Sequence, residues 1–390
     1  MRTDTQPKTT KKPPMKGMYP VMAVLTAYLM VFTAVPNEIT ALLALVMVAL
    51  FSLVFLRSKT LVALSALLLT VGVLYSGSLV ASASLVASVL IIGMGAMAIL
   101  HIRVPVSVLL AVAAYAAALI LTGDFAAAAY VFVPIPCMVV SAVLLACGAK
   151  RTTAICAAAA TYLATLAVPF LFALHAQYGS ISGDALLAFV NDIHQQLTDA
   201  ISVVLEEFRE MLPEQMNEML NGSFYSTLAE LTLCFTPAIL AIAALIPTFF
   251  ANMVSLIICK KTGGDRRLPE KAKAFEPSKV SAAAFLLSLL ISVVTFCIGI
   301  DGSEFSLLLV LTAGNLHLIL LFAFSVVGFS TIIGLLRQKR GCLNIGLIIG
   351  IILLFLNTGV FTVYPIAVAG ALHILRSPSL PDQDGDNFRS

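Results

Sequence analysis

Charged residues are scarce in this chain of 390 residues, and the shortage limits the class of protein that it can be. Asp, Glu, Lys and Arg make up only 11% of the residues, whereas 60% are apolar and the mean hydropathy is +1.02. In a soluble domain about a quarter of the residues are charged. The apolar runs are long and do not alternate with polar residues, which excludes a barrel of strands. The sequence therefore predicts an all-α fold, that of a polytopic helical membrane protein.

The sequence also lacks the motifs of metal sites and enzymes. Its seven cysteines include no C-x-x-C pair and lie in or beside apolar runs, so we interpret them as packing residues. No histidine pair has the spacing of a zinc protease. Residues 93–98 match a dinucleotide-binding motif by letter, but no strand precedes them, and close helix packing explains their glycines. We expect no enzyme activity, metal, cofactor or nucleic-acid partner.

Twelve apolar runs are predicted to cross the membrane as helices, because most of them approach the roughly 20 residues that span the hydrocarbon layer. Seven form an N-terminal bundle over 18–174 and five form a C-terminal bundle over 231–376, between a disordered basic tail (1–17) and a cytoplasmic tail (377–390). The runs are 18–35, 39–56, 60–75, 79–101, 104–122, 126–149, 153–174, 231–259, 280–300, 305–336, 342–357 and 360–375. Prolines are expected to kink several of them: Pro134, Pro136, Pro169, Pro237, Pro247 and Pro365.

The distribution of basic residues predicts how the chain is oriented. If the N-terminus is inside and the spans alternate, the inside segments hold 22 of the 23 Lys and Arg residues, and only Arg209 lies outside. Basic residues accumulate on the cytoplasmic side of membrane proteins. We therefore place both termini in the cytoplasm. The largest inside loop, 260–279, carries seven bases and is expected to touch lipid headgroups or a cytoplasmic partner.

Residues 175–230 separate the two bundles and differ from both in charge. They hold nine acids and one base, and they are predicted to lie outside the cell. Ser182 or Asp184 is placed to cap a helix, and Pro213 to end it. The segment is either an amphipathic extracytoplasmic helix packed on the membrane or on the bundle, or a docking face or lid. Its apolar residues recur every three or four positions: Leu186, Val190, Ile193, Leu197, Ile201, Val204, Phe208 and Met211.

Polar side chains inside the predicted spans are the candidates for binding a solute. Asn315 and His317 follow Gly314 in a long span, and Asn252 lies in the eighth span. In one interpretation Gly314 breaks the helix and these polar groups face a substrate cavity; in the other they form hydrogen bonds between helices. No Asp, Glu, Lys or Arg is predicted at mid-membrane, which disfavours coupling to protons or sodium but not a transporter driven by a separate protein.

Four stretches of the second half, over roughly 185–376, carry a resemblance to a known family. They are the amphipathic helix that leads into Thr236-Pro237-Ala238-Ile239-Leu240, Ala251-Asn252-Met253 with Pro269, Phe275 and Pro277, Gly314-Asn315-Leu316 with Gly328-Phe329-Ser330, and a last span ending at Gly370 and Arg376. In these stretches the chain resembles the YybS-like family of bacterial predicted membrane proteins of unknown function, and the first half agrees in layout only. The resemblance implies a distant similarity to the substrate-binding components of energy-coupling-factor vitamin transporters and to the rod-shape component of the cell-wall machinery. It implies no catalytic residues.

We therefore expect a multi-pass protein of the bacterial cytoplasmic membrane that acts as a small-molecule transport component. Asn252, Asn315 and His317 would form hydrogen bonds to the solute, and a cytoplasmic energising protein would be its partner. The alternative is a scaffold in cell-envelope assembly or sporulation, in which the acidic segment binds an extracytoplasmic protein. A transporter needs a polar cavity at mid-membrane, whereas a scaffold can fill that space with side chains.

Overall fold

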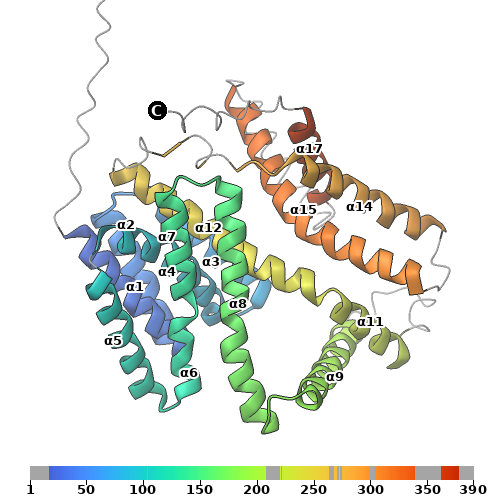
Figure 1. The fold of residues 1–390 in the computed structure, drawn as a ribbon, viewed down its shortest axis with the longest axis horizontal. Helices are drawn as coiled ribbons and strands as arrows, with labels where there is room; N and C mark the ends of the chain where they lie inside the picture. The colour runs from blue at the N-terminus through green and yellow to red at the C-terminus, as the bar shows by residue number, and fades with distance from the viewer. Residues whose placement is uncertain are drawn as a thin grey trace, which may run out of the picture. The chain divides into compact units, whose positions relative to one another are not determined.

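The protein is helical throughout the part of the chain that its structure describes. This computed structural model describes residues 17–102, 104–207, 220, 222–262, 268, 269, 272, 275–298, 304–338 and 362–376. Within these ranges there are helices and short connections but no strand, which confirms the all-α class. The chain divides into two compact units, residues 1–229 with 243–274, and residues 230–242 with 275–390. Figure 1 shows the helices of both units.

Most of the helices begin and end close to the limits of the predicted spans. Those of the first unit are α1 (Met18–Ala34), α2 (Glu38–Val54), α3 (Lys59–Ser76), α4 (Leu79–His101), α5 (Val104–Thr122), α6 (Phe125–Ala129), the 3-10 helix η1 (Tyr130–Phe132), α7 (Pro134–Ala146), α8 (Arg151–Tyr178) and α9 (Gly183–Glu207). Those of the second unit are α14 (Lys279–Ile298), α15 (Glu304–Gln338) and α17 (Val363–Arg376). Two helices, α11 (Gly222–Cys234) and α12 (Thr236–Thr262), pass from one unit to the other.

Several of these helices have the length and hydropathy of membrane spans, so the chain is a multi-pass membrane protein. Six described helices are long and apolar enough to cross a bilayer, and five more are apolar but shorter. Proline interrupts the sixth predicted span as expected, because α6 and η1 precede a new helix that starts at Pro134. The run 342–357 lies outside the described residues, so the total of twelve spans stays a prediction.

The core of the first unit is built around α4, which contacts α1, α3 and α7. Small residues on α4 let its neighbours approach closely. A Cβ atom placed on Gly93 would lie 2.6 Å from the carbonyl oxygen of Ala251, and one placed on Gly95 would overlap the sulfur of Met138. Ser255 on α12 also donates a hydrogen bond to the Gly93 carbonyl oxygen, at 3.0 Å. Close helix packing therefore explains the glycines of residues 93–98, as predicted.

The second unit is a bundle in which α14, α15 and α17 all contact one another. In Figure 1, α14 and α15 run side by side and α17 lies against them. The closest approach is between α15 and α17, where a Cβ atom on Gly370 would lie 2.7 Å from the amide nitrogen of Gly328. Phe285 and Phe324 are fully buried in the core of this bundle. The two glycines thus hold α17 against the face of α15 that carries the aromatic core.

One of the two interpretations of α15 is wrong. In that interpretation Gly314 breaks the helix, but α15 continues from Glu304 to Gln338 without interruption. A Cβ atom on Gly314 would lie 2.7 Å from the ring of Phe235. Gly314 therefore makes room for a neighbouring aromatic ring and does not loosen its own helix. The break occurs instead in the predicted span 231–259, at Phe235, where α11 ends and α12 begins.

Candidate functional site

The break between α11 and α12 has a covalent cause. Pro237 has no backbone N–H, so it cannot donate to the carbonyl of Leu233 one turn earlier, and its ring pushes that carbonyl away. The next pair in an unbroken helix would be the amide of Ala238 and the carbonyl of Cys234. Inside a membrane, an amide and a carbonyl that separate in this way need other partners, because no water is there to replace them.

Asn315 supplies both partners from α15. Its Oδ1 accepts a hydrogen bond from the amide of Ala238 at 3.0 Å, and its Nδ2 donates to the carbonyl oxygen of Cys234, also at 3.0 Å. The same Nδ2 donates to Leu311 within α15, at 2.9 Å. The side-chain amide thus takes the place of one missing backbone hydrogen bond. These contacts agree with the interpretation in which Asn315 holds helices together.

His317 lies two residues further along α15, in the interior of the second unit. Its side chain is 4% exposed and is held between two aromatic rings. The Phe285 ring lies 5.0 Å from the imidazole at an angle of 10°, and the Tyr364 ring lies 5.5 Å from it at 16°. Phe285 comes from α14 and Tyr364 from α17, so all three helices of the bundle fix the plane of the imidazole.

Among the described residues, only one side of this imidazole has a hydrogen-bond partner. Nδ1 lies 3.4 Å from the hydroxyl oxygen of Ser288, whose single proton is donated to the Phe285 carbonyl oxygen at 2.8 Å. Ser288 is therefore an acceptor for the proton on Nδ1, and in a neutral imidazole Nε2 then carries a lone pair. Within the described residues, Nε2 is buried and has no hydrogen-bond partner. This nitrogen can accept a hydrogen bond from an O–H or N–H group.

Asn252 belongs to the first unit and pairs with a basic residue. Its Oδ1 accepts a hydrogen bond from Nε of Arg151, the first residue of α8, at 2.9 Å. The guanidinium carbon of Arg151 also lies 5.3 Å from the centre of the Phe249 ring, in the geometry of a cation–π contact. Arg151 is one of the 22 bases predicted to lie in inside segments, and in the structure its side chain packs against α12.

The structure thus gives the three predicted residues three separate surroundings. Asn315 and His317 share α15 but face different neighbours, because side chains two positions apart point in nearly opposite directions on a helix. Sequence reasoning did not identify the residues around His317, namely Phe285, Ser288 and Tyr364. Their signal is weak, because serine and aromatic residues are common in apolar helices and these three are distant from His317 in sequence. The solute-binding role of Asn252, Asn315 and His317 stays a prediction.

The acidic segment contains the amphipathic helix α9. Ser182 caps it, as predicted, because its hydroxyl oxygen accepts a hydrogen bond from the amide of Ala185 at 3.2 Å. The Tyr178 hydroxyl donates to Asp192 at 2.6 Å, which ties α9 to the end of α8. The Tyr225 hydroxyl donates to Glu206 at 3.0 Å, which ties α9 to α11. Two of the acids of this segment are therefore held by tyrosines.

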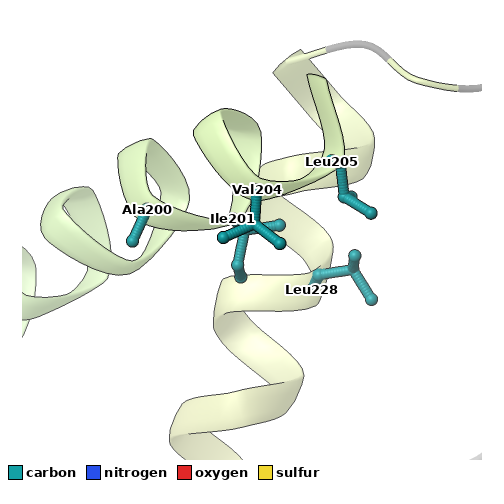
Figure 2. Close-up of a pocket in the computed structure, with 5 residues that line it drawn as sticks. All are labelled: Ala200, Ile201, Val204, Leu205 and Leu228. Carbon is teal, nitrogen blue, oxygen red and sulfur yellow. The ribbon is translucent and has the colours of Figure 1, made fainter. Parts of the chain in front are cut away.

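Between α9 and α11 lies an open apolar groove of about 340 Å³. Figure 2 shows Ile201 and Val204 of α9 lying over α11, with Leu228 of α11 close by. Ala200 and Leu205 complete the lining, so every lining residue is apolar. Within the described residues there is also no group of three or more metal-ligating side chains. Arg209 and Pro213 lie outside the described residues, as do residues 263–267, 270, 271, 273 and 274 of the loop 260–279.

A comparison with known families identifies one match. Residues 97–372 match the family described as predicted membrane protein DUF2232. This match is consistent with the YybS-like resemblance, and it begins well before residue 185, so it includes several spans of the first half. No curated protein and no solved structure matches the chain.

Proposed function

The chain belongs to the DUF2232 family of predicted membrane proteins, and we propose that it is a small-molecule transport component that binds its solute at His317. The observation that carries the proposal is the buried Nε2 of this residue, which has no partner among the described residues. We place the protein in the bacterial cytoplasmic membrane with both termini in the cytoplasm, where the distribution of basic residues supports that orientation. The partner that drives transport would be a cytoplasmic protein.

The ring stacking and the hydrogen bond between Nδ1 and Ser288 do not explain the second nitrogen of His317, because Nε2 has no partner among the described residues. A phenylalanine would stack between Phe285 and Tyr364 equally well, and it would bring no polar nitrogen into the membrane. An unpaired polar group in an apolar interior costs about 1–3 kcal/mol. Ionisable side chains within membrane helices mark the paths of solutes and ions more often than they stabilise the fold. A solute that pairs with Nε2 would remove this cost, which supports a binding role.

The surroundings of Nε2 also indicate the kind of solute. The nitrogen offers a lone pair, so the solute would carry an O–H or N–H donor. The stacked rings on both sides of the imidazole are apolar, so the rest of the solute would be largely apolar or planar. Asn315 and Asn252 already form hydrogen bonds to protein groups, and we assign them to helix packing and not to the solute.

The proposal is tested by purifying the protein in mild detergent and identifying bound small molecules and proteins by mass spectrometry. The decisive variant is His317→Phe, which keeps the aromatic stack and removes Nε2. The control is His373→Phe on α17, which replaces an exposed histidine of the same unit. We expect the wild type and the control to retain a metabolite that His317→Phe loses at least tenfold. Equal retention by all three proteins, or no retained metabolite in the wild type, would contradict the proposal.

The second candidate function is a scaffold in cell-envelope assembly or sporulation. It is favoured by the acids on the described part of α9, which includes Asp184, Asp192, Asp199, Glu206 and Glu207 but no Lys or Arg. Such a face suits a basic extracytoplasmic protein. In the same purification, recovery of an envelope-assembly protein without a metabolite would favour this function. Loss of that protein from an Asp199→Lys variant would then assign the contact to α9.

A further inference from the structure

We propose that α9 lies along the membrane surface with its apolar stripe in the lipid, independently of the solute site. The stripe is the apolar row of the described helix: Leu186, Val190, Ile193, Leu197, Ile201 and Val204. Of these side chains, Leu186 is 47% exposed, Val190 is 38% exposed and Val204 is 51% exposed. The first unit therefore covers only part of the stripe, and the rest of its apolar surface is exposed.

The connection from α8 places α9 at the membrane surface. α8 has 28 residues and a rise of 1.5 Å per residue gives it a length of about 42 Å, more than the roughly 30 Å of the hydrocarbon layer. Its end at Tyr178 therefore reaches the headgroups. A turn at Gly179, with a φ of 73°, follows, and α9 begins only four residues later at Gly183. So short a connection keeps the start of α9 at the interface.

The end of α8 that contacts α9 also exposes apolar side chains. Near its end, α8 exposes Val168 by 52% and Phe172 by 53%, in a helix that is apolar and long enough to span the membrane. On the opposite side of α8, Phe170 packs edge-to-face against Phe189 of α9, with ring centres 5.2 Å apart. The start of α9 is therefore attached to one face of a helix whose other face exposes apolar side chains. A bilayer that surrounds this end of α8 also reaches the start of α9.

Charge and groove chemistry both favour lipid as the occupant of the stripe. The acids of α9 lie opposite the stripe, and the described helix has no Lys or Arg to attract anionic headgroups. A basic protein partner would therefore meet the acidic face and not the stripe. The groove beside Ile201 and Leu228 is lined by apolar residues alone, which suits an acyl chain. Burial of apolar surface must drive the contact, so neutral lipids are preferred to anionic ones.

The absence of tryptophan from the chain makes a direct test possible, because one introduced Trp becomes a unique fluorophore. Val190→Trp and Val204→Trp report on the stripe, and Gln195→Trp on the opposite, exposed face is the matched control. Each full-length variant is reconstituted into phosphatidylcholine vesicles with and without brominated acyl chains. We expect brominated lipid to quench the two stripe variants at least threefold more than the control, and aqueous iodide to show the reverse order.

Two outcomes would overturn the proposal. If iodide quenches the stripe variants as strongly as Gln195→Trp, the stripe faces water. If neither agent quenches them, protein covers the stripe, either another part of this chain, a second copy or a partner. Leu187→Trp, at a neighbouring position that is 61% exposed, repeats the test if a stripe variant folds poorly. Replacement of part of the phosphatidylcholine by phosphatidylglycerol should lower quenching at the stripe, and an increase would contradict the role assigned to charge.

Discussion

Two regions of the second unit each contain a polar side chain of α15, Asn315 in one and His317 in the other, and the two side chains differ in how fully they are hydrogen-bonded. At the junction of α11 and α12, Asn315 fills a gap that Pro237 opens in the backbone hydrogen-bond pattern, and both ends of its amide are used. In the core of α14, α15 and α17, His317 is more deeply buried, yet its Nε2 has no partner among the described residues. The fold pairs both ends of the Asn315 amide, whereas among the described residues it pairs only the Nδ1 side of the His317 imidazole.

Asn315 and His317 differ in their hydrogen-bond partners, and this difference, more than the residue type, distinguishes a structural polar residue from a functional candidate. Both residues are polar, both lie in a span, and both belong to the segment that resembles the family. Asn315 replaces a backbone hydrogen bond that is missing beside Pro237, so helix packing is sufficient to explain this asparagine. Within the described residues, the Nε2 of His317 has no partner, and for this reason we propose that the nitrogen binds a solute.

The largest change in stability is expected from Asn315→Leu, which removes the polar group that pairs with the backbone at the junction of α11 and α12. The substitution leaves the amide of Ala238 and the carbonyl of Cys234 without their partner within an apolar span. Each unpaired group costs about 1–3 kcal/mol, so we expect the free energy of unfolding to fall by about 2–4 kcal/mol. Thermal or denaturant unfolding in detergent micelles measures the change. Thr312→Leu, at an exposed position of the same helix, is the control and should change stability little.

A smaller effect is expected from Pro237→Ala, which tests whether the proline is the reason that the fold needs Asn315. Pro237→Ala restores a backbone N–H and allows the amide of Ala238 to approach Cys234 again. Asn315 then has less to supply, so Asn315→Leu should destabilise the Pro237→Ala background less than the wild type, by about 1–2 kcal/mol. A double-mutant cycle of the two substitutions measures this coupling. Additive effects would mean that Asn315 stabilises the protein for a reason unrelated to the proline.

A still smaller loss of stability is expected from Asn252→Leu in the first unit. Asn252 accepts a hydrogen bond from Arg151, and Arg151 also contacts Phe249. Asn252→Leu removes one hydrogen bond to Arg151 but leaves the contact with Phe249. We expect a loss of about 1 kcal/mol in stability and no change in any bound solute. The measurements are unfolding and mass spectrometry, with Met253→Leu as the control. Loss of a bound solute from Asn252→Leu would return Asn252 to the binding site.

The sequence was sufficient to locate most helices and to select the informative polar residues, because membrane spans are defined by local composition and length. Ser182 as a cap and the tight packing of Gly93 and Gly95 could also be predicted from local chemistry. The position of the helix break could not be predicted from the sequence. Gly314 and Pro237 were both plausible places, and only the fold shows that a phenylalanine ring fills the space at Gly314 while the backbone separates beside Pro237.

The contacts of the candidate site were beyond sequence reasoning because they join distant parts of the chain. Asn252 and Arg151 are 101 positions apart, and Ser288 and His317 are 29 apart. Nothing in either local sequence indicates the pairing. The polar residues could therefore be named from the sequence, but whether each was satisfied or unpaired could be read only from its neighbours in space.

The most direct test of this account compares the stability of His317→Phe and Asn315→Leu in the same detergent, free of added ligand. Because His317→Phe keeps the ring stack and removes an unpaired buried nitrogen, we expect it to raise the free energy of unfolding by about 1 kcal/mol. Asn315→Leu should lower it. Opposite signs would support a fold that needs Asn315 and carries His317 for binding. A loss of stability in both variants would show that His317 is also a packing residue, and it would contradict the proposal that this histidine is present for binding.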